Sequence, residues 1–149
     1  MAWTPAAWTV FGLVALAVHP QADYVLVELP AGRSHSPLRL VLAEAALDRT
    51  LHGPYRLVRR LPGKALRGAR YRPLFTFLPA SKGTNQVVVS ESVPLDRGTG
   101  VMPVSPAFDS LSLQVAAAHK LPLPELIDQG GRLGDAAGPW RGLSPLDAE

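Results

Sequence analysis

The clearest indications of the fold come from residues 24–64, YVLVELPAGRSHSPLRLVLAEAALDRTLHGPYRLVRRLPGK. Its first run, 24–29, is rich in β-branched and aromatic residues and closes at Pro30-Ala31-Gly32, which is the pattern of a strand that enters a turn. Residues 38–42, LRLVL, follow Pro37 and are interpreted as a second strand. The two runs predict a β-hairpin.

The second half of this stretch adds a helix and a third strand. Residues 43–51, AEAALDRTL, suit a short helix that ends at Gly53-Pro54, because neither residue continues a helix well. Residues 55–61 return as a strand and are followed by the turn Pro62-Gly63-Lys64. A hairpin, a helix and a returning strand indicate a mixed α/β fold.

Further short elements are expected on the C-terminal side. Strands are predicted at 86–90 and, after a glycine turn, over 98–104, where Pro103 should lie at an edge or a bulge. A helix is predicted over 110–120 with Ser110 or Asp109 as its N-cap, and a closing hairpin over 126–133. Many short strands with two helices between them predict a mixed, mostly antiparallel sheet curled into a β-barrel with short peripheral helices.

Composition indicates one globular domain in a reducing compartment. The 149 residues are 47% hydrophobic and 18% charged and contain no cysteine. A chain of this length has room for one core, so residues 1–149 are expected to form a single domain, with the Gly/Pro-rich segment 134–149 as a loop or linker-like tail. The lack of cysteine excludes a disulfide framework, and we expect a cytoplasmic location. A formal charge of +3 permits a polyanionic partner without requiring one.

The apolar segment 6–18 raises the alternatives of a signal peptide or a membrane span. It is shorter than the roughly 20 residues that a span needs, and no Lys or Arg precedes it to form a basic n-region. The first basic residue other than His is Arg33. We therefore expect a buried segment that makes no contact with a membrane.

Four separated pieces of the chain carry recognisable motifs in a fixed order. They are WTPAAWT (3–9) with ALAVHP (15–20), GKALRG (63–68) with YRPLF (71–75), GTGV (98–101) with SPAF (105–108), and LPL (121–123) with DQGGR (128–132). Together they are similar to WTTTPWT…AVHP, GKxLxGLxYEPLF, GTGIVHxAPAFGxxD and GLPxxxxVDExGK, the motifs of the editing domain of isoleucyl-tRNA synthetases. The chain thus resembles the class Ia Ile/Val/Leu synthetase editing-domain family over nearly its whole length.

The resemblance implies a reaction. Such a domain hydrolyses valine that has been wrongly esterified to the isoleucine tRNA, because a hydrophobic pocket rejects a substrate lacking one methylene by only about 10–200-fold. The partners implied are the aminoacylated 3′ end of tRNA and, as a further candidate, the rest of a synthetase. No cofactor and no metal are implied, and the four scattered His residues without any Cys give no zinc-ligand spacing either.

The resemblance also assigns substrate-binding residues. Two tryptophans wall the family's pocket, and the GTG and PAF motifs lie beside them. The corresponding residues here are Trp3, Trp8, Gly98, Thr99, Gly100, Pro106, Ala107 and Phe108. For the tryptophans, core filling is the alternative interpretation, because large flat side chains near a turn serve either purpose.

Several catalytic positions of the family are altered. Thr4 is what remains of the threonine run, since Pro5 and Ala6 take the next two positions. Leu13 stands where the family has an asparagine, and Pro103 where it has a histidine. Removing one preorganised polar contact costs roughly 10²–10³ in rate, so hydrolysis by the family's route is expected to be weak.

The family's aspartate, which binds the substrate ammonium, corresponds to Ser112. A neutral hydroxyl lacks the charge that a carboxylate brings to an ammonium, so Ser112→Asp is expected to restore part of the activity. Asp109, three residues earlier, is the substitute that helical spacing offers. Its alternative role is the N-cap of the following helix. Thr4, Asp109 and Ser112 are therefore the candidate catalytic residues.

A basic cluster is the candidate contact for tRNA phosphate. It includes Arg59, Arg60, Lys64 and Arg67. A solvated basic surface explains the same residues equally well. Two further functions stay open beside the editing reaction: a degenerate editing domain that binds tRNA or a synthetase without hydrolysis, and a synthetase-derived fold used for an unrelated interaction.

Overall fold

The computed structural model describes residues 1–31, 36–75, 78 and 83–148. The chain divides into two compact units, which we call unit 1 and unit 2. Unit 1 comprises Met1–Trp3, Ala17–Arg67 and Val89–Met102, and unit 2 comprises Thr4–Leu16, Gly68–Val88 and Pro103–Glu149. The chain therefore passes between the units several times, and each unit is built from segments far apart in the sequence.

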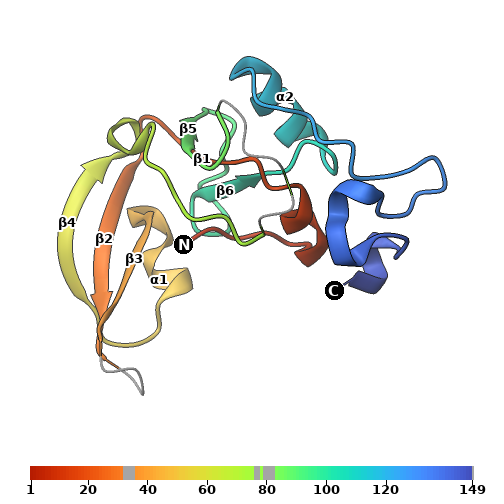
Figure 1. The fold of residues 1–149 in the computed structure, drawn as a ribbon. Helices are drawn as coiled ribbons and strands as arrows, with labels where there is room; N and C mark the ends of the chain where they lie inside the picture. Colours follow the sequence, from red (N-terminus) through yellow and green to blue (C-terminus); the bar gives the residue numbers. More distant parts are fainter. Residues whose placement is uncertain (32–35, 76–77, 79–82, 149) are drawn as a thin grey trace. The chain divides into compact units, whose positions relative to one another are not determined.

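A three-stranded antiparallel sheet forms the body of unit 1. Its order is β3-β2-β4, made of Leu38–Ala43, Asp23–Leu29 and Arg56–Pro62. Figure 1 shows these strands side by side, with α1 next to β3. The predicted strands at 24–29, 38–42 and 55–61 are thus confirmed within one residue at each end. The predicted turn after β2 extends to residue 32, which lies outside the described residues.

The middle strand β2 supplies the core because it has neighbours on both sides. Tyr24, Val25 and Val27 are each 0% exposed, which means that both faces of the sheet are covered at this end. At its other end Glu28 accepts hydrogen bonds from Arg39 at 2.9 Å and Arg56 at 2.7 Å, so it ties both neighbouring strands together. These two guanidinium groups hold the pKa of Glu28 below its usual value.

The predicted helix over 43–51 is shorter than expected. Ala43 ends β3 instead of starting the helix, and the 3₁₀ turn η2 (Glu44–Ala46) leads into α1 (Leu47–Thr50). The reason is a long-range contact: the Ala43 backbone N–H donates to the Thr99 carbonyl at 2.9 Å. This bond fixes Ala43 in extended backbone, with φ −62° and ψ 139°. A further 3₁₀ turn, η3 (Gly63–Leu66), follows β4.

Unit 2 contains one α-helix, several 3₁₀ turns and an apolar cluster. The elements are η1 (Ala7–Gly12), α2 (Ser110–Ala118), η4 (Asp135–Trp140) and η5 (Pro145–Ala148), of which η1 and η4 pack against the cluster. The buried centre consists of Phe11, Leu126, Leu133 and Ala137. The predicted hairpin over 126–133 is present as a single antiparallel bridge between Ile127 and Leu133.

The C-terminal segment is more structured than the loop expected for 134–149. Leu133 donates its N–H to the Leu143 carbonyl and accepts from Gly142 N–H, which closes this segment on itself. Trp140 lies 5.1 Å from Phe11 and 5.2 Å from Phe75, measured between ring centroids. Gly and Pro residues thus shape two 3₁₀ turns here and do not mark a free linker.

The predicted barrel is not found among the described residues. The structure has two separate three-stranded sheets, the second in the order β5-β1-β6, made of Val87–Val89, Ala15–Val18 and Val101–Val104. A closed barrel requires a neighbour on each side of every strand, whereas β3 and β4 each have only one. Pro103 lies in β6, an edge strand, as expected for a residue without an N–H. No helix within the described ranges is long and apolar enough to cross a membrane.

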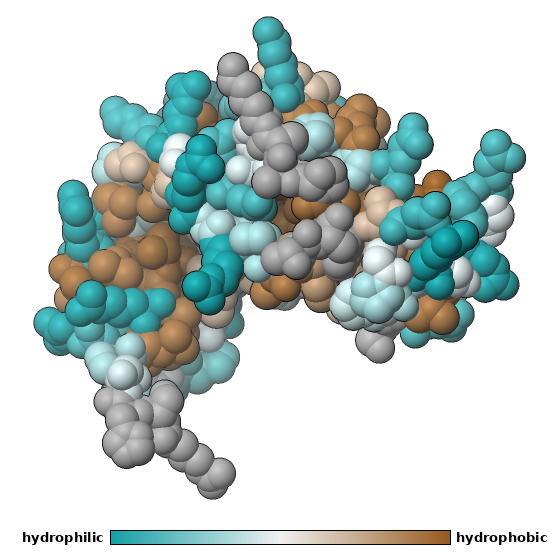
Figure 2. Space-filling model, in the orientation of Figure 1, coloured by the Kyte–Doolittle hydropathy of each residue, from teal (hydrophilic) through white to brown (hydrophobic). Residues whose placement is uncertain are grey.

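Side-chain chemistry is unevenly spread over the surface. Figure 2 shows apolar side chains gathered over the sheet of unit 1, with hydrophilic side chains around them. Leu38, Leu57 and Val58 are the exposed apolar residues of that sheet, on its outer strands β3 and β4. The sheet of unit 1 therefore keeps part of its apolar surface in contact with solvent.

Candidate functional site

The turn Gly98-Thr99-Gly100 is fixed in place by its three carbonyl groups. Arg49 Nε donates to the Gly98 carbonyl at 2.8 Å, Ala43 N–H to the Thr99 carbonyl at 2.9 Å, and the Tyr24 hydroxyl to the Gly100 carbonyl. Gly98 and Gly100 have φ of 60° and 71°, in the left-handed region that favours glycine. Three hydrogen bonds to three different residues therefore hold the backbone of this turn within unit 1.

Trp3 covers this turn. A Cβ atom added at Gly98 would lie 2.7 Å from Trp3 Cε3, so a larger residue at position 98 would collide with the indole. The Trp3 N–H donates to the Val101 carbonyl at 3.3 Å, and Trp3 is 45% exposed. The structure thus brings Trp3 and Gly98 together, and the exposed part of the indole stays available to a ligand.

Trp8 belongs to unit 2 and packs against the apolar cluster around Phe11. Phe108 packs against the same cluster, and a Cβ atom at Gly12 would lie 2.8 Å from its ring. Pro106 is buried and Ala107 is exposed. Trp8 and Phe108 are therefore both partly buried against the core of unit 2.

The Thr4 hydroxyl is engaged within its own loop. It lies 2.9 Å from the Thr9 hydroxyl, donates to the Ala6 carbonyl at 3.1 Å and accepts from Ala6 N–H at 3.3 Å. These contacts close the loop that leads into η1. Thr4 must give up some of them before it can orient a water molecule.

Asp109 is the N-cap of α2. Its Oδ1 accepts a hydrogen bond from Ser112 N–H at 2.7 Å, which confirms one of the two caps expected from the sequence. Ser112 is 1% exposed, and its hydroxyl faces the Pro103 carbonyl at 3.5 Å. Asp109 therefore presents an exposed carboxylate, whereas Ser112 is closed off from solvent.

The four candidate tRNA contacts differ in whether another side chain already pairs with them. All four are exposed, but Arg60 is paired with Glu44 at 2.8 Å. Arg59 lies opposite Leu26 and Arg60 opposite Val25, so these neighbouring side chains point to opposite faces of the sheet. Arg59, Lys64 and Arg67 make no side-chain ion pair or hydrogen bond within the part of the chain that the structure describes.

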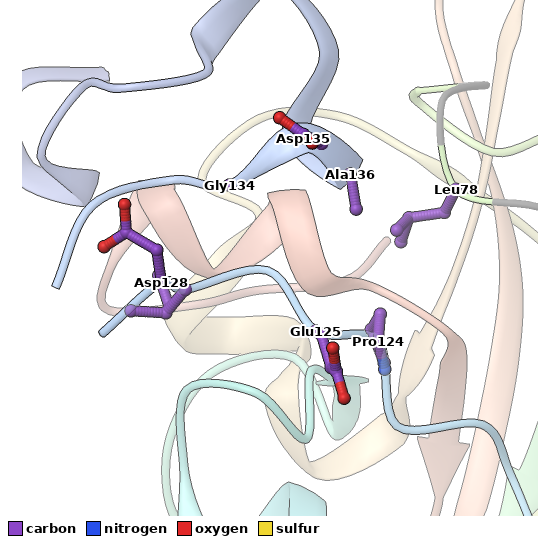
Figure 3. A pocket seen from close by; sticks show the side chains of 8 residues that line it. Leu78, Pro124, Glu125, Asp128, Gly134, Asp135 and Ala136 are labelled. Atoms are coloured by element: carbon purple, nitrogen blue, oxygen red, sulfur yellow. The ribbon is translucent and has the colours of Figure 1, made fainter. Parts of the chain in front are cut away.

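A cavity in unit 2 is lined by none of the residues predicted for the site. Its volume is about 480 Å³, and it is lined by Leu78, Pro124, Glu125, Ile127, Asp128, Gly134, Asp135 and Ala136. Figure 3 shows Leu78 pointing toward Ala136 on one side, with Glu125 on the other. Its acidic side chains would repel phosphate. From the sequence, this cavity could be linked only to the motif DQGGR, which contains Asp128. The Asp128 carboxylate accepts hydrogen bonds from the N–H groups of Gly130 and Arg132.

The described ranges contain no group of three or more His, Cys, Asp or Glu side chains placed to hold a metal ion. Among the residues that the structure describes, the buried hydroxyls of Tyr71 and Ser105 in unit 2 have no hydrogen-bond partner. Burial raises the pKa of Tyr71 to about 12. Ser105 takes a position where the family motif has alanine, directly before Pro106.

Ser105→Ala is expected to raise the free energy of unfolding by about 1 kcal/mol, because it removes a buried hydroxyl that was desolvated without a partner. Urea unfolding followed by circular dichroism measures the change. Ser144→Ala is the matched control in the same unit, since its hydroxyl accepts from Leu146 N–H at 3.2 Å and its loss should destabilise slightly. A loss of stability in Ser105→Ala as large as in the control would contradict this expectation.

Comparison with known proteins places these observations in a family. No protein-family model matches the chain. The isoleucine–tRNA ligase of Clostridium novyi is 34% identical over 143 residues, which is 96% of this chain and 13% of the ligase. That of Nocardia farcinica is 32% identical over 149 residues, 98% of this chain and 14% of the ligase. The chain thus spans about one seventh of the length of these curated relatives.

Solved structures show the same fold. The crystal structure of GlLeuRS-CP1 superimposes with a TM-score of 0.61 at 19% identity, covering 78% of this chain and 42% of that one. The editing domain of the Plasmodium falciparum cytosolic leucyl-tRNA synthetase gives 0.58 at 16% identity, covering 80% and 46%. Relatives by sequence and neighbours by fold agree, and so this chain belongs to the editing-domain family of isoleucyl- and leucyl-tRNA synthetases.

Proposed function

We propose that this chain is an aminoacyl-tRNA editing domain that receives the aminoacylated 3′ end of a tRNA and hydrolyses the ester of a mischarged amino acid. The observation that carries the proposal is the 34% identity with an isoleucine–tRNA ligase across 96% of the chain. An identity that extends over nearly the whole chain includes all four motif pieces in their order. The substrate expected from the resemblance is of the Val-tRNA(Ile) type, acted on in the cytoplasm.

Two groups of residues are proposed to bind substrate. In unit 1 the exposed part of Trp3 and the fixed turn of Gly98, Thr99 and Gly100 form one group. In unit 2 Trp8 and the segment Pro106, Ala107 and Phe108 form the other, where Trp8 and Phe108 also stabilise the core. Large aromatic side chains and an immobile backbone suit recognition of a small aliphatic group.

The hydrolytic step is proposed to be weak because the candidate catalytic groups are already engaged. Thr4 is bound to Thr9 and Ala6, and Ser112 is buried against the Pro103 carbonyl. Asp109 is the best candidate for the substrate ammonium: one carboxylate oxygen caps α2, and the exposed side chain has a second oxygen. A carboxylate bound to an ammonium forms a charge-assisted hydrogen bond, which is about twice as strong as a neutral one.

Transfer RNA is proposed to contact the basic residues of unit 1. Arg59, Lys64 and Arg67 are the stronger candidates, because Arg60 is neutralised by Glu44. Each phosphate contact adds to the salt dependence of tRNA binding. The rest of a synthetase is the second proposed partner, since the relatives by sequence are about seven times longer than this chain.

A second candidate function is binding without hydrolysis. It is favoured by the same engaged hydroxyls and by the apolar residues Leu13 and Pro103, which have no polar side-chain group to offer a water molecule. In this case the chain would hold the aminoacylated end or a synthetase and leave the ester intact.

Release of valine from mischarged isoleucine tRNA by the purified protein tests the proposal. We expect release above the protein-free rate, and we expect Asp109→Asn to slow it by about tenfold, mostly through KM, because the ammonium loses its charged partner. Asparagine is as good an N-cap as aspartate, so the free energy of unfolding should stay within about 0.5 kcal/mol.

The outcomes separate the two candidates. No release of valine, together with binding of the mischarged tRNA in a filter assay, would reject hydrolysis and leave the binding module. Neither release nor binding would reject both. Release that is unaffected by Asp109→Asn would support the reaction and remove Asp109 from its mechanism.

A further inference from the structure

Arg49 makes an unusual set of contacts in unit 1. It lies in α1, and each of its three guanidinium nitrogens donates to a different backbone carbonyl at 2.8 Å: Nη1 to Ala45, Nη2 to Leu95 and Nε to Gly98. Ala45 belongs to η2, directly before α1, whereas Leu95 and Gly98 lie 46 and 49 residues along the chain. One side chain therefore fastens the loop 95–98 to the helical segment beside β3 (Figure 1).

The other two carbonyls of the glycine turn are held by rigid neighbours. Thr99 accepts from the backbone of Ala43, at the end of β3, and Gly100 accepts from the Tyr24 hydroxyl of β2. Tyr24 is fully buried, and its hydroxyl also accepts from His19 N–H at 2.9 Å. Of the three donor residues, Arg49 is the exposed one, so its side chain is the one that can change position.

The chemistry of this contact requires arginine. A guanidinium group directs donors in a planar fork and can satisfy three carbonyls that lie in different directions, whereas an ammonium is a single point on a flexible stem. Its full set of contacts also separates Arg49 from the basic residues proposed for tRNA, because Arg59, Lys64 and Arg67 have no such contacts within the described residues.

We propose that Arg49 is a positioning residue of the editing site: it holds Gly98-Thr99-Gly100 in the conformation on which Trp3 rests. The assignment of a role in substrate binding depends on the proposed function, since it assumes that this turn meets the substrate. The mechanical part of the proposal, that Arg49 holds the turn in place, does not depend on the proposed function. Gly98 leaves no room for a Cβ under Trp3, so a displaced turn also displaces the indole.

The mechanical part can be tested by amide hydrogen exchange measured with NMR. The N–H groups of Ala43 and Trp3 donate to carbonyls of Thr99 and Val101, so their exchange reports whether the turn is in place. The N–H of Gly63 donates to Ala22 at 2.8 Å elsewhere in unit 1 and reports the stability of the unit itself. In Arg49→Met we expect exchange about tenfold faster at Ala43 and Trp3, with Gly63 unchanged.

Two variants make the comparison specific. Arg49→Lys keeps the charge without the fork and should behave like Arg49→Met. Arg97→Met removes an exposed arginine next to Gly98 that makes no hydrogen bond or ion pair within the described ranges, and it should leave all three amides as in the wild type. The proposal would be overturned if exchange in Arg49→Met were equally faster at all three amides or not faster at any of them. It would also be overturned if Arg49→Lys exchanged like the wild type.

The functional part uses an adenosine that carries valine through a stable amide in place of the ester. For a protein that binds this probe, Arg49→Met should raise the Kd about tenfold while Arg97→Met leaves it unchanged, and an unchanged Kd in Arg49→Met would remove the turn from the binding site. A wild-type protein that does not bind the probe would count against the proposed function. The amide exchange would then still decide whether Arg49 positions the turn.

Discussion

Gly63→Ala is expected to lower the free energy of unfolding by about 3 kcal/mol or more, a large part of the roughly 5–15 kcal/mol typical of a domain. A Cβ atom at this position would lie 2.0 Å from the His19 carbonyl oxygen and 2.9 Å from Tyr24 Cε2. The first contact is with backbone, which cannot rotate away as a side chain does. The variant must therefore separate η3 from the segment before β2, and it loses the bond from Gly63 N–H to the Ala22 carbonyl.

Chemical denaturation of the purified variant gives this difference, and Gly53→Ala is its control. Within the described part of the chain, a Cβ atom added at Gly53, in the same unit, would meet no atom within 4 Å beyond Gly53 and its two chain neighbours. The same substitution there should be neutral or stabilise by up to about 1 kcal/mol, because alanine has fewer unfolded conformations to lose. Equal stability of the two variants would show that the close approach of His19 and Gly63 does not exist in solution.

The strands around residues 24–61 could be predicted because their information is local. Short runs rich in apolar residues and the turn residues Pro30 and Pro62 mark the strands within a few residues of the chain. The connection between the first two runs predicts their pairing as a hairpin, whereas the pairing of β4 with β2 is known only from the structure. The sheet β3-β2-β4 is therefore the part of the fold that the sequence specifies best.

The structure differs from the sequence-based predictions where contacts join residues that are far apart in the chain. Ala43 was predicted to start a helix, but its bond to Thr99 ends β3 there instead. The barrel was predicted from the number of short strands, but closure depends on which strands pair, and this the sequence pattern does not contain. The tail was predicted from its Gly and Pro content, which does not show that Trp140 packs against Phe11 and Phe75.

The candidate site was predictable in its residue types and not in its contacts. The motif order singled out the GTG turn and helical spacing singled out Asp109, but neither shows that Thr4 and Ser112 already have partners. Arg49 gave no signal, because two of its acceptors are more than 40 residues away in sequence.

Ser112→Asp is expected to destabilise the protein by about 3 kcal/mol at neutral pH, because it places a carboxylate at a position that is 1% exposed. The Pro103 carbonyl oxygen, which the Ser112 hydroxyl faces, repels an anion, and the Asp109 carboxylate lies at the same end of α2. A carboxylate in the first turn of a helix gains only about 0.3–1 kcal/mol from the helix dipole, which is too little to offset the burial.

Ser112→Asn is the control for this variant, since it has nearly the same volume without the charge, and the difference between the two variants isolates the carboxylate. Burial raises the pKa of the new carboxyl in the folded state, so the folded protein holds the proton more tightly than the unfolded chain does. The penalty in Ser112→Asp is therefore smallest below the pKa of the unfolded chain, about 4, and grows as the pH rises. Urea denaturation at about pH 4 and pH 7 measures both the size of the penalty and its direction.

The same variant decides which carboxylate binds the substrate ammonium. The resemblance assigns that role to position 112 and predicts a gain in hydrolysis from Ser112→Asp, whereas the buried Ser112 and the exposed Asp109 favour position 109. We therefore expect Ser112→Asp to lose stability without gaining deacylation, and Asp109→Asn to lose deacylation without losing stability. If Ser112→Asp is instead as stable as the wild type and releases valine faster, position 112 opens to the substrate, and the family's arrangement of charge is retained in this chain.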